Sequence, residues 1–132
     1  MEAGSSYCLE RFNFVENFSA FTRNLLGNEL FHDVTLISED FEYFHANKLV
    51  LSANSEFFMG AFDNLKTTSP VIWLHEVKGE DIKSLLQFVY EGKTEVPEEN
   101  LSRLLPVARK LQIRGLGETG NEKSEKECNE KK

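Results

Sequence analysis

Residues 31–62 constrain the fold more than any other stretch, because a predicted hairpin there gives way to a helical pattern. Two short apolar runs, at 34–37 and at 41–44, are separated only by Ser38, Glu39 and Asp40. Aliphatic and aromatic runs joined by a polar, turn-prone triplet are typical of a β-hairpin. A small sheet is therefore expected at the centre of the fold.

The residues after the hairpin predict two short, mostly buried helices. The first is a compact apolar run at 46–53, and the second carries Phe57, Phe58 and Phe62. Ser55 stands between them, and its hydroxyl can accept a backbone N–H of the following turn, as N-cap residues do. A hairpin that leads into two helices gives the chain a hydrophobic centre.

A further helix is predicted before this centre. Asn13 is expected to cap it, and Gly27 is expected to end it in a left-handed conformation. Its apolar residues are spaced four, three and four apart and share one face: Phe14, Phe18, Phe21 and Leu25. This face suits either the core of the domain or a partner molecule, and the pattern fits both.

After the centre, a strand and a helix are predicted. Four apolar residues in a row at 71–74 suit a strand covered on both faces, or nearly so. Residues 80–90 have an apolar helical face, and Gly92 follows as a helix terminator.

The last predicted elements surround two prolines. Residues 93–96 form a brief extended piece, and Pro97 stands where a helix can begin. Pro106 is expected to break that helix, because it has no N–H for the i to i−4 bond, so 107–113 is predicted as a separate helix.

The totals limit the chain to one domain and exclude several functions. It has 132 residues, a net charge of −7 and a pI near 5.0. Binding of nucleic acid by this segment is not expected, because no cluster of Lys and Arg is present to neutralise phosphates. No apolar run is long enough to span a bilayer, and no signal peptide is recognisable. Cys8 and Cys128 lie in opposite end segments, which favours two lone thiols in an intracellular protein.

We expect a flexible head at 1–6, the folded domain at 7–117 and a disordered charged linker or tail at 118–132. Apart from Cys128, the tail contains only polar, charged or small residues. Such a segment cannot bury enough apolar area to offset the entropy lost on ordering.

No catalytic or cofactor site is predicted. His32, His45 and His75 lie in separate elements without the close spacing of zinc ligands. No nucleophile elbow and no glycine-rich phosphate loop occurs, so neither an enzyme nor a cofactor is expected.

Asp33 and Lys48 are the charged residues that stand out, because both lie inside otherwise apolar stretches. A charge there is costly unless it is paired or hydrogen-bonded. Either each side chain reaches the surface at the end of its element, or the two are buried and compensate each other.

The order of these residues resembles the BTB/POZ domain, over residues 7–117. The central matches are Asp33-Val34-Thr35-Leu36, Phe44-His45-Ala46-x-Lys48-x-Val50-Leu51 and Ser55-x-Phe57-Phe58. The outer matches resemble the arthropod tramtrack-like subgroup of transcription and chromatin regulators: Tyr7-Cys8-Leu9, Phe62-Asp63-Asn64 and Arg114-Gly115-Leu116.

The resemblance implies an α+β fold in which a small mixed sheet is flanked by a cluster of short helices. It implies a module for protein–protein interaction: a homodimer first, with larger or mixed assemblies possible. The parent protein would be a nuclear regulator of transcription or chromatin, and partners would be other BTB proteins or corepressor-type proteins.

The resemblance also implies a dimer interface in which the first helix packs on its symmetry mate and an N-terminal strand pairs with a late strand of the other chain. The interface residues expected are Tyr7, Cys8, Leu9, Phe14, Phe18, Phe21, Leu25, Lys93, Thr94, Glu95 and Val96. A charged pocket near the dimer axis would contain Asp33 and Lys48, with Asn47 where many relatives have His.

The sequence disfavours two other functions that BTB domains serve. Adaptors of cullin-type ubiquitin ligases carry an apolar-x-Glu motif after the third helix, whereas residues 63–69 contain no Glu. Tetramerisation of potassium channels is disfavoured further by the lack of a membrane segment in this sequence.

Overall fold

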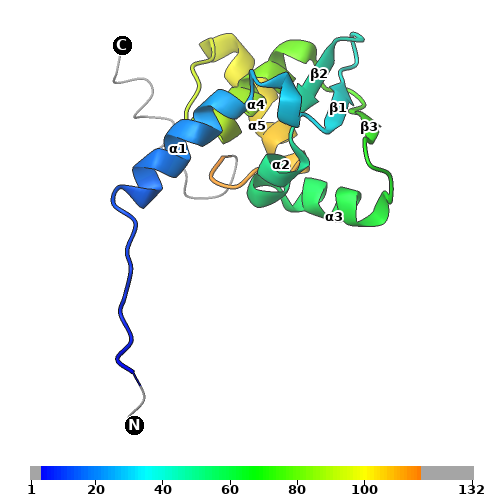
Figure 1. Cartoon of the computed structure of the whole chain (residues 1–132). Helices are drawn as coiled ribbons and strands as arrows, with labels where there is room; N and C mark the ends of the chain where they lie inside the picture. The colour runs from blue at the N-terminus through cyan, green and yellow to red at the C-terminus, as the bar shows by residue number, and fades with distance from the viewer. Residues whose placement is uncertain (1–3, 117–132) are drawn as a thin grey trace.

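The computed structural model describes residues 4–116. Figure 1 shows a cluster of helices beside a small sheet. In chain order the elements are α1 (Phe14–Leu25), a 3-10 turn (Glu29–Phe31), β1 (Val34–Ile37), β2 (Tyr43–Ala46), α2 (Lys48–Asn54), α3 (Glu56–Asn64), β3 (Val71–Trp73), α4 (Gly79–Glu91) and α5 (Glu98–Lys110). The α+β class with a small mixed sheet is confirmed.

The sheet has three strands in the order β2-β1-β3. β1 and β2 form the predicted antiparallel hairpin, while β3 runs parallel to β1. β2 starts later than predicted because Phe41 has a left-handed backbone (φ 63°) and belongs to the loop.

The prediction that the strand at 71–74 is covered on both faces is wrong. Val71 and Trp73 are 61% and 58% exposed, whereas Ile72 packs against the core. Leu74 is buried, but it follows the end of β3. Of these four residues, Ile72 and Leu74 therefore contribute to the core, while Val71 and Trp73 face outward, because the described helices pack on only one face of the sheet.

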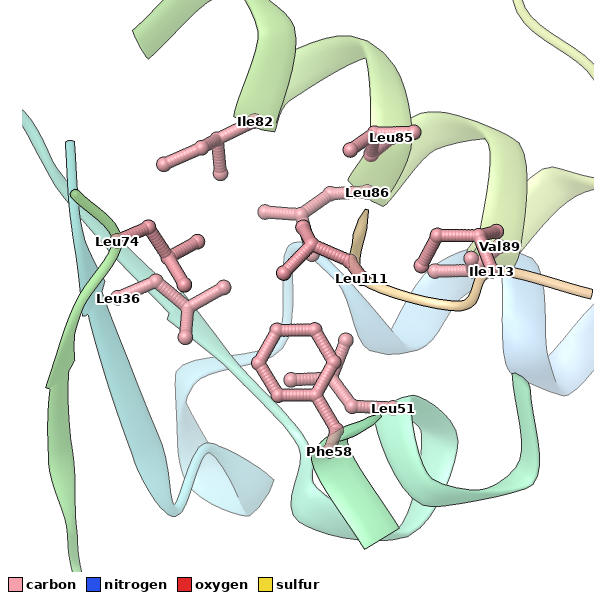
Figure 2. Close-up of a pocket in the computed structure, with 10 residues that line it drawn as sticks. All are labelled: Leu36, Leu51, Phe58, Leu74, Ile82, Leu85, Leu86, Val89, Leu111 and Ile113. Carbon is pink, nitrogen blue, oxygen red and sulfur yellow. The ribbon is translucent and has the colours of Figure 1, made fainter. Parts of the chain in front are cut away.

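The core lies between the sheet and α2, α3 and α4 (Figure 2). Leu36 and Leu74 come from the sheet side, and Phe58 and Leu51 come from the helices below it. A cavity of about 20 Å³ remains among these side chains, and its lining is entirely apolar. It has room for about one water-sized sphere but offers no polar partner, so it is a packing defect and not a ligand site.

Ser55 caps α3 as predicted, and it also binds the segment that follows α5. Its Oγ accepts the N–H of Phe58 at 3.1 Å and donates to the carbonyl of Leu111 at 2.6 Å. Backbone bridging between Ser55 and Ile113 continues this contact. A single buried hydroxyl thus joins α3 to the segment that closes the fold.

The two C-terminal helices agree only partly with the sequence prediction. α4 ends at Gly92, whose φ of 90° is the expected left-handed terminator. α5 continues through Pro106, so the predicted break is wrong. Pro106 is exposed, and the loss of its one hydrogen bond is outweighed by the burial of Leu104, Val107 and Ala108 on the other face.

The ends of α1 also differ from the prediction. Asn13 occupies the N-cap position, but its backbone is left-handed (φ 56°) and its side chain makes no capping bond. Gly27 is not left-handed, and the helix ends at Leu26 with ordinary helical angles. Instead, His32 Nε2 donates to the carbonyl of Leu26 at 2.9 Å and satisfies one of the free carbonyls at the helix end.

Candidate association surface

α1 carries an aromatic face that stays about half-exposed in the part of the chain that the structure describes. None of its residues is buried, and Phe14, Phe18 and Phe21 are 53%, 60% and 52% exposed. The end of the helix, at Leu25 and Leu26, packs against the core. A helix of 12 residues is marginal in water by itself, so most of its stability must come from packing of its apolar face.

The exposed rings of α1 are already ordered against one another. Phe14 and Phe18 stack with their centroids 6.2 Å apart, and the guanidinium of Arg11 lies 5.7 Å from the centroid of Phe14. Phe21 meets Phe31 edge to face at 6.4 Å. Contacts of this kind hold the rings in place before any binding, which would lower the entropy cost of covering them.

The segment before α1 projects away from the body of the domain (Figure 1). Residues 4–11 form neither helix nor strand, and all are exposed. Its large apolar side chains are among the most exposed of the described chain: Tyr7 at 86%, Leu9 at 93% and Phe12 at 84%. We refer to residues 4–12 as the arm.

The second segment of the expected strand exchange, at 93–96, is not a strand in the single chain. Thr94 donates to Oε1 of Gln87 at 2.8 Å, and Val96 packs against the core, while Lys93 and Glu95 are exposed. The fold of one chain does not bring this segment to the arm (Figure 1). Pairing between them remains a prediction about two chains.

The three residues of the predicted charged pocket do lie together, but not as an ion pair. Asp33 Oδ1 accepts the backbone N–H of Lys48 at 2.7 Å, at the first residue of α2. No ion pair joins the Asp33 carboxylate to the Lys48 ammonium within residues 4–116. Both side chains are only half-buried, so the structure does not show two buried charges that compensate each other. Instead, Asp33, which directly precedes β1, caps the first turn of α2.

Asn47 is the buried member of this group, and its polar atoms are engaged. Its side-chain amide donates to the carbonyl of Phe31 at 2.7 Å, and its Oδ1 accepts the hydroxyl of Tyr90 at 2.6 Å. Burial is the main cause that raises the pKa of Tyr90 to about 12; the Asn47 N–H acts against this rise, and the negative charge of Asp33 contributes to it. The sequence pattern predicted only that Tyr90 is buried, and it did not indicate the hydrogen bonds between Tyr90 and Asn47.

No catalytic or cofactor arrangement is apparent among the described residues. Within 4–116, no three His, Cys, Asp or Glu side chains lie close enough together to hold a metal ion. His32 and His45 stack with their centroids 6.2 Å apart, which the sequence did not indicate. None of the helices described for residues 4–116 is long and apolar enough to cross a membrane.

Comparison with known proteins gives a consistent result. The family model of the BTB/POZ domain matches residues 22–127. The chain is similar to the Drosophila melanogaster proteins tramtrack, alpha isoform (38% identity over 92% of this chain and 15% of that protein), and bric-a-brac 2 (37% over 87% and 11%). It is also similar to zinc finger protein chinmo of the same organism (35% over 91% and 20%).

A solved structure agrees with the observed fold. The BTB domain of zebrafish PATZ1 superposes with a TM-score of 0.68 at 26% identity, covering 95% of this chain and 96% of that one. The curated relatives are much longer, because the chain spans at most a fifth of the three named above.

Proposed function

Because the chain belongs to the BTB/POZ domain family, whose domain is a protein-interaction module, we propose that it is the self-association module of a nuclear regulator of transcription or chromatin. The proposal for the whole protein rests on its relatives, one of which is named a zinc finger protein. Any DNA-binding part would then lie outside this segment, whose net charge of −7 does not favour phosphate binding.

The exposed aromatic face of α1 is the observation that carries the proposal. Among soluble homo-oligomers the commonest form is the symmetric dimer, which uses the same self-complementary patch on both copies. The row of Phe14, Phe18 and Phe21 offers such a patch, because aromatic rings packed between two copies bury large areas at low entropic cost. Truncation of a central aromatic residue in such an interface typically costs on the order of 2 kcal/mol or more.

The arm provides the second part of the proposal. An extended segment with unpaired backbone groups is stable only when it adds to other strands or is covered. Pairing of the arm with residues 93–96 of a second chain would order both segments. Arms and edges left over after dimerisation would permit larger or mixed assemblies, including ones with other BTB proteins or corepressor-type proteins.

The experiment compares two exposed aromatic residues on different elements. Phe18→Ser removes a ring from α1, and Phe41→Ser removes a ring of similar exposure (69%) from the hairpin loop. Sedimentation velocity over a range of protein concentrations should show that Phe18→Ser shifts the association by more than about tenfold, while Phe41→Ser leaves it unchanged. Equal behaviour of the two variants would contradict the assignment of α1 as the interface.

A further inference from the structure

The outer face of the sheet is a second apolar surface, and it is separate from α1. β-sheet register places Tyr43, Ile37 and Trp73 in one row on this face, with Val71 in the adjoining row. Tyr43, Val71 and Trp73 are 63%, 61% and 58% exposed. The helices of residues 4–116 cover only the opposite face, so these side chains do not contribute to the core.

Aromatic residues from two loops extend this face at one end. Phe41, from the hairpin loop, stacks on Trp73 with the centroids 6.1 Å apart, and His75 meets Trp73 edge to face at 6.2 Å. Phe41 and Glu76 both have left-handed backbones (φ 63°), which is unusual for non-glycine residues and especially for a bulky one. Strain of this kind is retained where the placed side chain has a use.

Within residues 4–116, no strand pairs with the outer edge of β3, the strand that carries Trp73. β3 is the last strand of the sheet and follows Pro70, whose carbonyl accepts the N–H of Thr35. Leu74, at the other end, donates to the carbonyl of Ile37. Since backbone groups alternate in direction along a strand, the N–H and C=O groups of Val71 and Trp73 point away from β1. In Figure 1, β3 stands at the outer side of the molecule with no element beyond it.

The charge around this surface indicates the charge of the partner that it would bind. The loops at the Phe41 end of this surface carry four carboxylates, on Glu39, Asp40, Glu42 and Glu76, and one cation, Lys78, whereas the α3–β3 loop at the other end carries Lys66 and no carboxylate. Lys78 already pairs with Glu39 at 3.4 Å. Two copies of such a surface would repel each other, which argues against a second copy of this chain and favours a basic partner.

We propose that this surface, the outer sheet patch (Phe41, Tyr43, Val71, Trp73 and Glu76), docks an extended segment of another protein in which basic and apolar residues alternate. The segment adds to β3 as a new edge strand through the backbone groups of Val71 and Trp73. Its side chains on the exposed face lie over Trp73 and Phe41, where guanidinium groups stack on aromatic rings and are attracted by Glu76.

Trp73 is the only tryptophan of the chain, so its fluorescence reports binding directly. The probe is a capped peptide of three arginine–valine repeats, titrated into the full chain. We expect a saturable change in Trp73 emission that weakens as salt is raised. A peptide of three glutamate–valine repeats, and one with three arginines followed by three valines, should bind at least tenfold more weakly.

Single substitutions test how much each part of the outer sheet patch contributes to peptide binding. Phe41→Ser and Glu76→Gln should each weaken binding severalfold, while Met59→Ser on α3 and Glu91→Gln at the end of α4 serve as controls of matched type. Val71→Pro removes an outward N–H without removing a bond to β1 and should abolish binding. Unchanged binding by Phe41→Ser and Val71→Pro would overturn the proposal.

A second readout covers the case in which Val71→Pro disturbs the fold. In the unsubstituted protein labelled with nitrogen-15, the backbone amides of Val71 and Trp73 should gain protection from hydrogen exchange when the peptide binds. Binding without this protection would contradict strand addition. The sedimentation behaviour of the patch variants should stay that of the parent, so failure here is distinguishable from failure of the self-association proposal.

Discussion

Tyr90 donates its hydroxyl proton to Oδ1 of Asn47 at 2.6 Å and accepts the backbone N–H of the same residue at 2.8 Å. These two bonds fix the residue that precedes α2 against α4, far away in the sequence. Asn47 also donates to the carbonyl of Phe31, so the buried network reaches the turn that follows α1. One buried side chain thus links the turn that follows α1 to α4.

Replacement of Tyr90 should therefore destabilise the domain. Tyr90→Phe keeps the ring but leaves two buried polar groups of Asn47 without their partner, which costs on the order of 1–3 kcal/mol. Chemical denaturation at fixed protein concentration measures this cost. Tyr43→Phe, at an exposed position, is the matched control and should be close to neutral.

The same contact predicts a loss of stability at high pH. The pKa of Tyr90 is about 12 in the folded chain, against 10 for the unperturbed phenol. An acid whose folded pKa is raised contributes stability below pH 10 and loses it as the pH rises toward 12. Tyr90→Phe should remove this part of the pH dependence. Identical profiles of parent and variant between pH 10 and 12 would show that the hydroxyl is not protected by burial.

Because Asp33 caps α2 through the backbone N–H of Lys48, substitution of Asp33 should cost more stability than substitution of Lys48. Asp33→Ala leaves the first N–H of α2 without an acceptor and should cost about 1–2 kcal/mol. Lys48→Gln should change the free energy of unfolding by less than about 0.5 kcal/mol, because the contact uses its backbone and not its ammonium. Thermal unfolding of both variants tests this. A large cost for Lys48→Gln would reinstate an ionic role for that side chain.

Asp33 also shows what sequence reasoning can and cannot supply. Its place in an apolar stretch correctly marked it as a residue with a specific partner. The pattern suggested the ammonium of Lys48, because side-chain charges are visible in a sequence whereas backbone N–H groups of distant elements are not. The contact of Asn47 with Tyr90 was missed for the same reason, since the two residues are far apart and each looks ordinary in its own segment.

Pro106 is a second case in which a local sequence rule was wrong, and it gives a further prediction. A local rule predicted a broken helix, yet burial of three residues on the opposite face keeps α5 continuous. Pro106→Ala restores the missing N–H at an exposed position and should stabilise the domain by about 1 kcal/mol or more. A lower melting temperature of the alanine variant would indicate that the proline ring makes a needed contact.

The pairing of the arm with a second chain can be tested with its own cysteine. Cys8 is exposed in the arm, and Glu95 is exposed in the segment at 93–96. In a background of Cys128→Ser, a residue outside the described part of the chain, Glu95→Cys should form disulfide-linked dimers with Cys8 under mild oxidation. Met59→Cys, at an exposed position on α3, should not. Equal cross-linking of both would mean that random collisions and not strand pairing bring the thiols together.

The sequence predicted the helical spacing of the aromatic face correctly, yet it left open whether the face belonged to the core or to a partner. The structure narrows this choice, because Leu25 packs inward while the three phenylalanines stay half-exposed. Whether a second molecule covers these three rings is not encoded in the periodicity of one helix.

The mass of the unsubstituted chain in solution tests the central claim most directly. Sedimentation equilibrium at micromolar concentration should give at least twice the chain mass of 15.1 kDa, and the melting temperature should rise with protein concentration. A folded species of single-chain mass, with a melting temperature independent of concentration, would contradict self-association through α1.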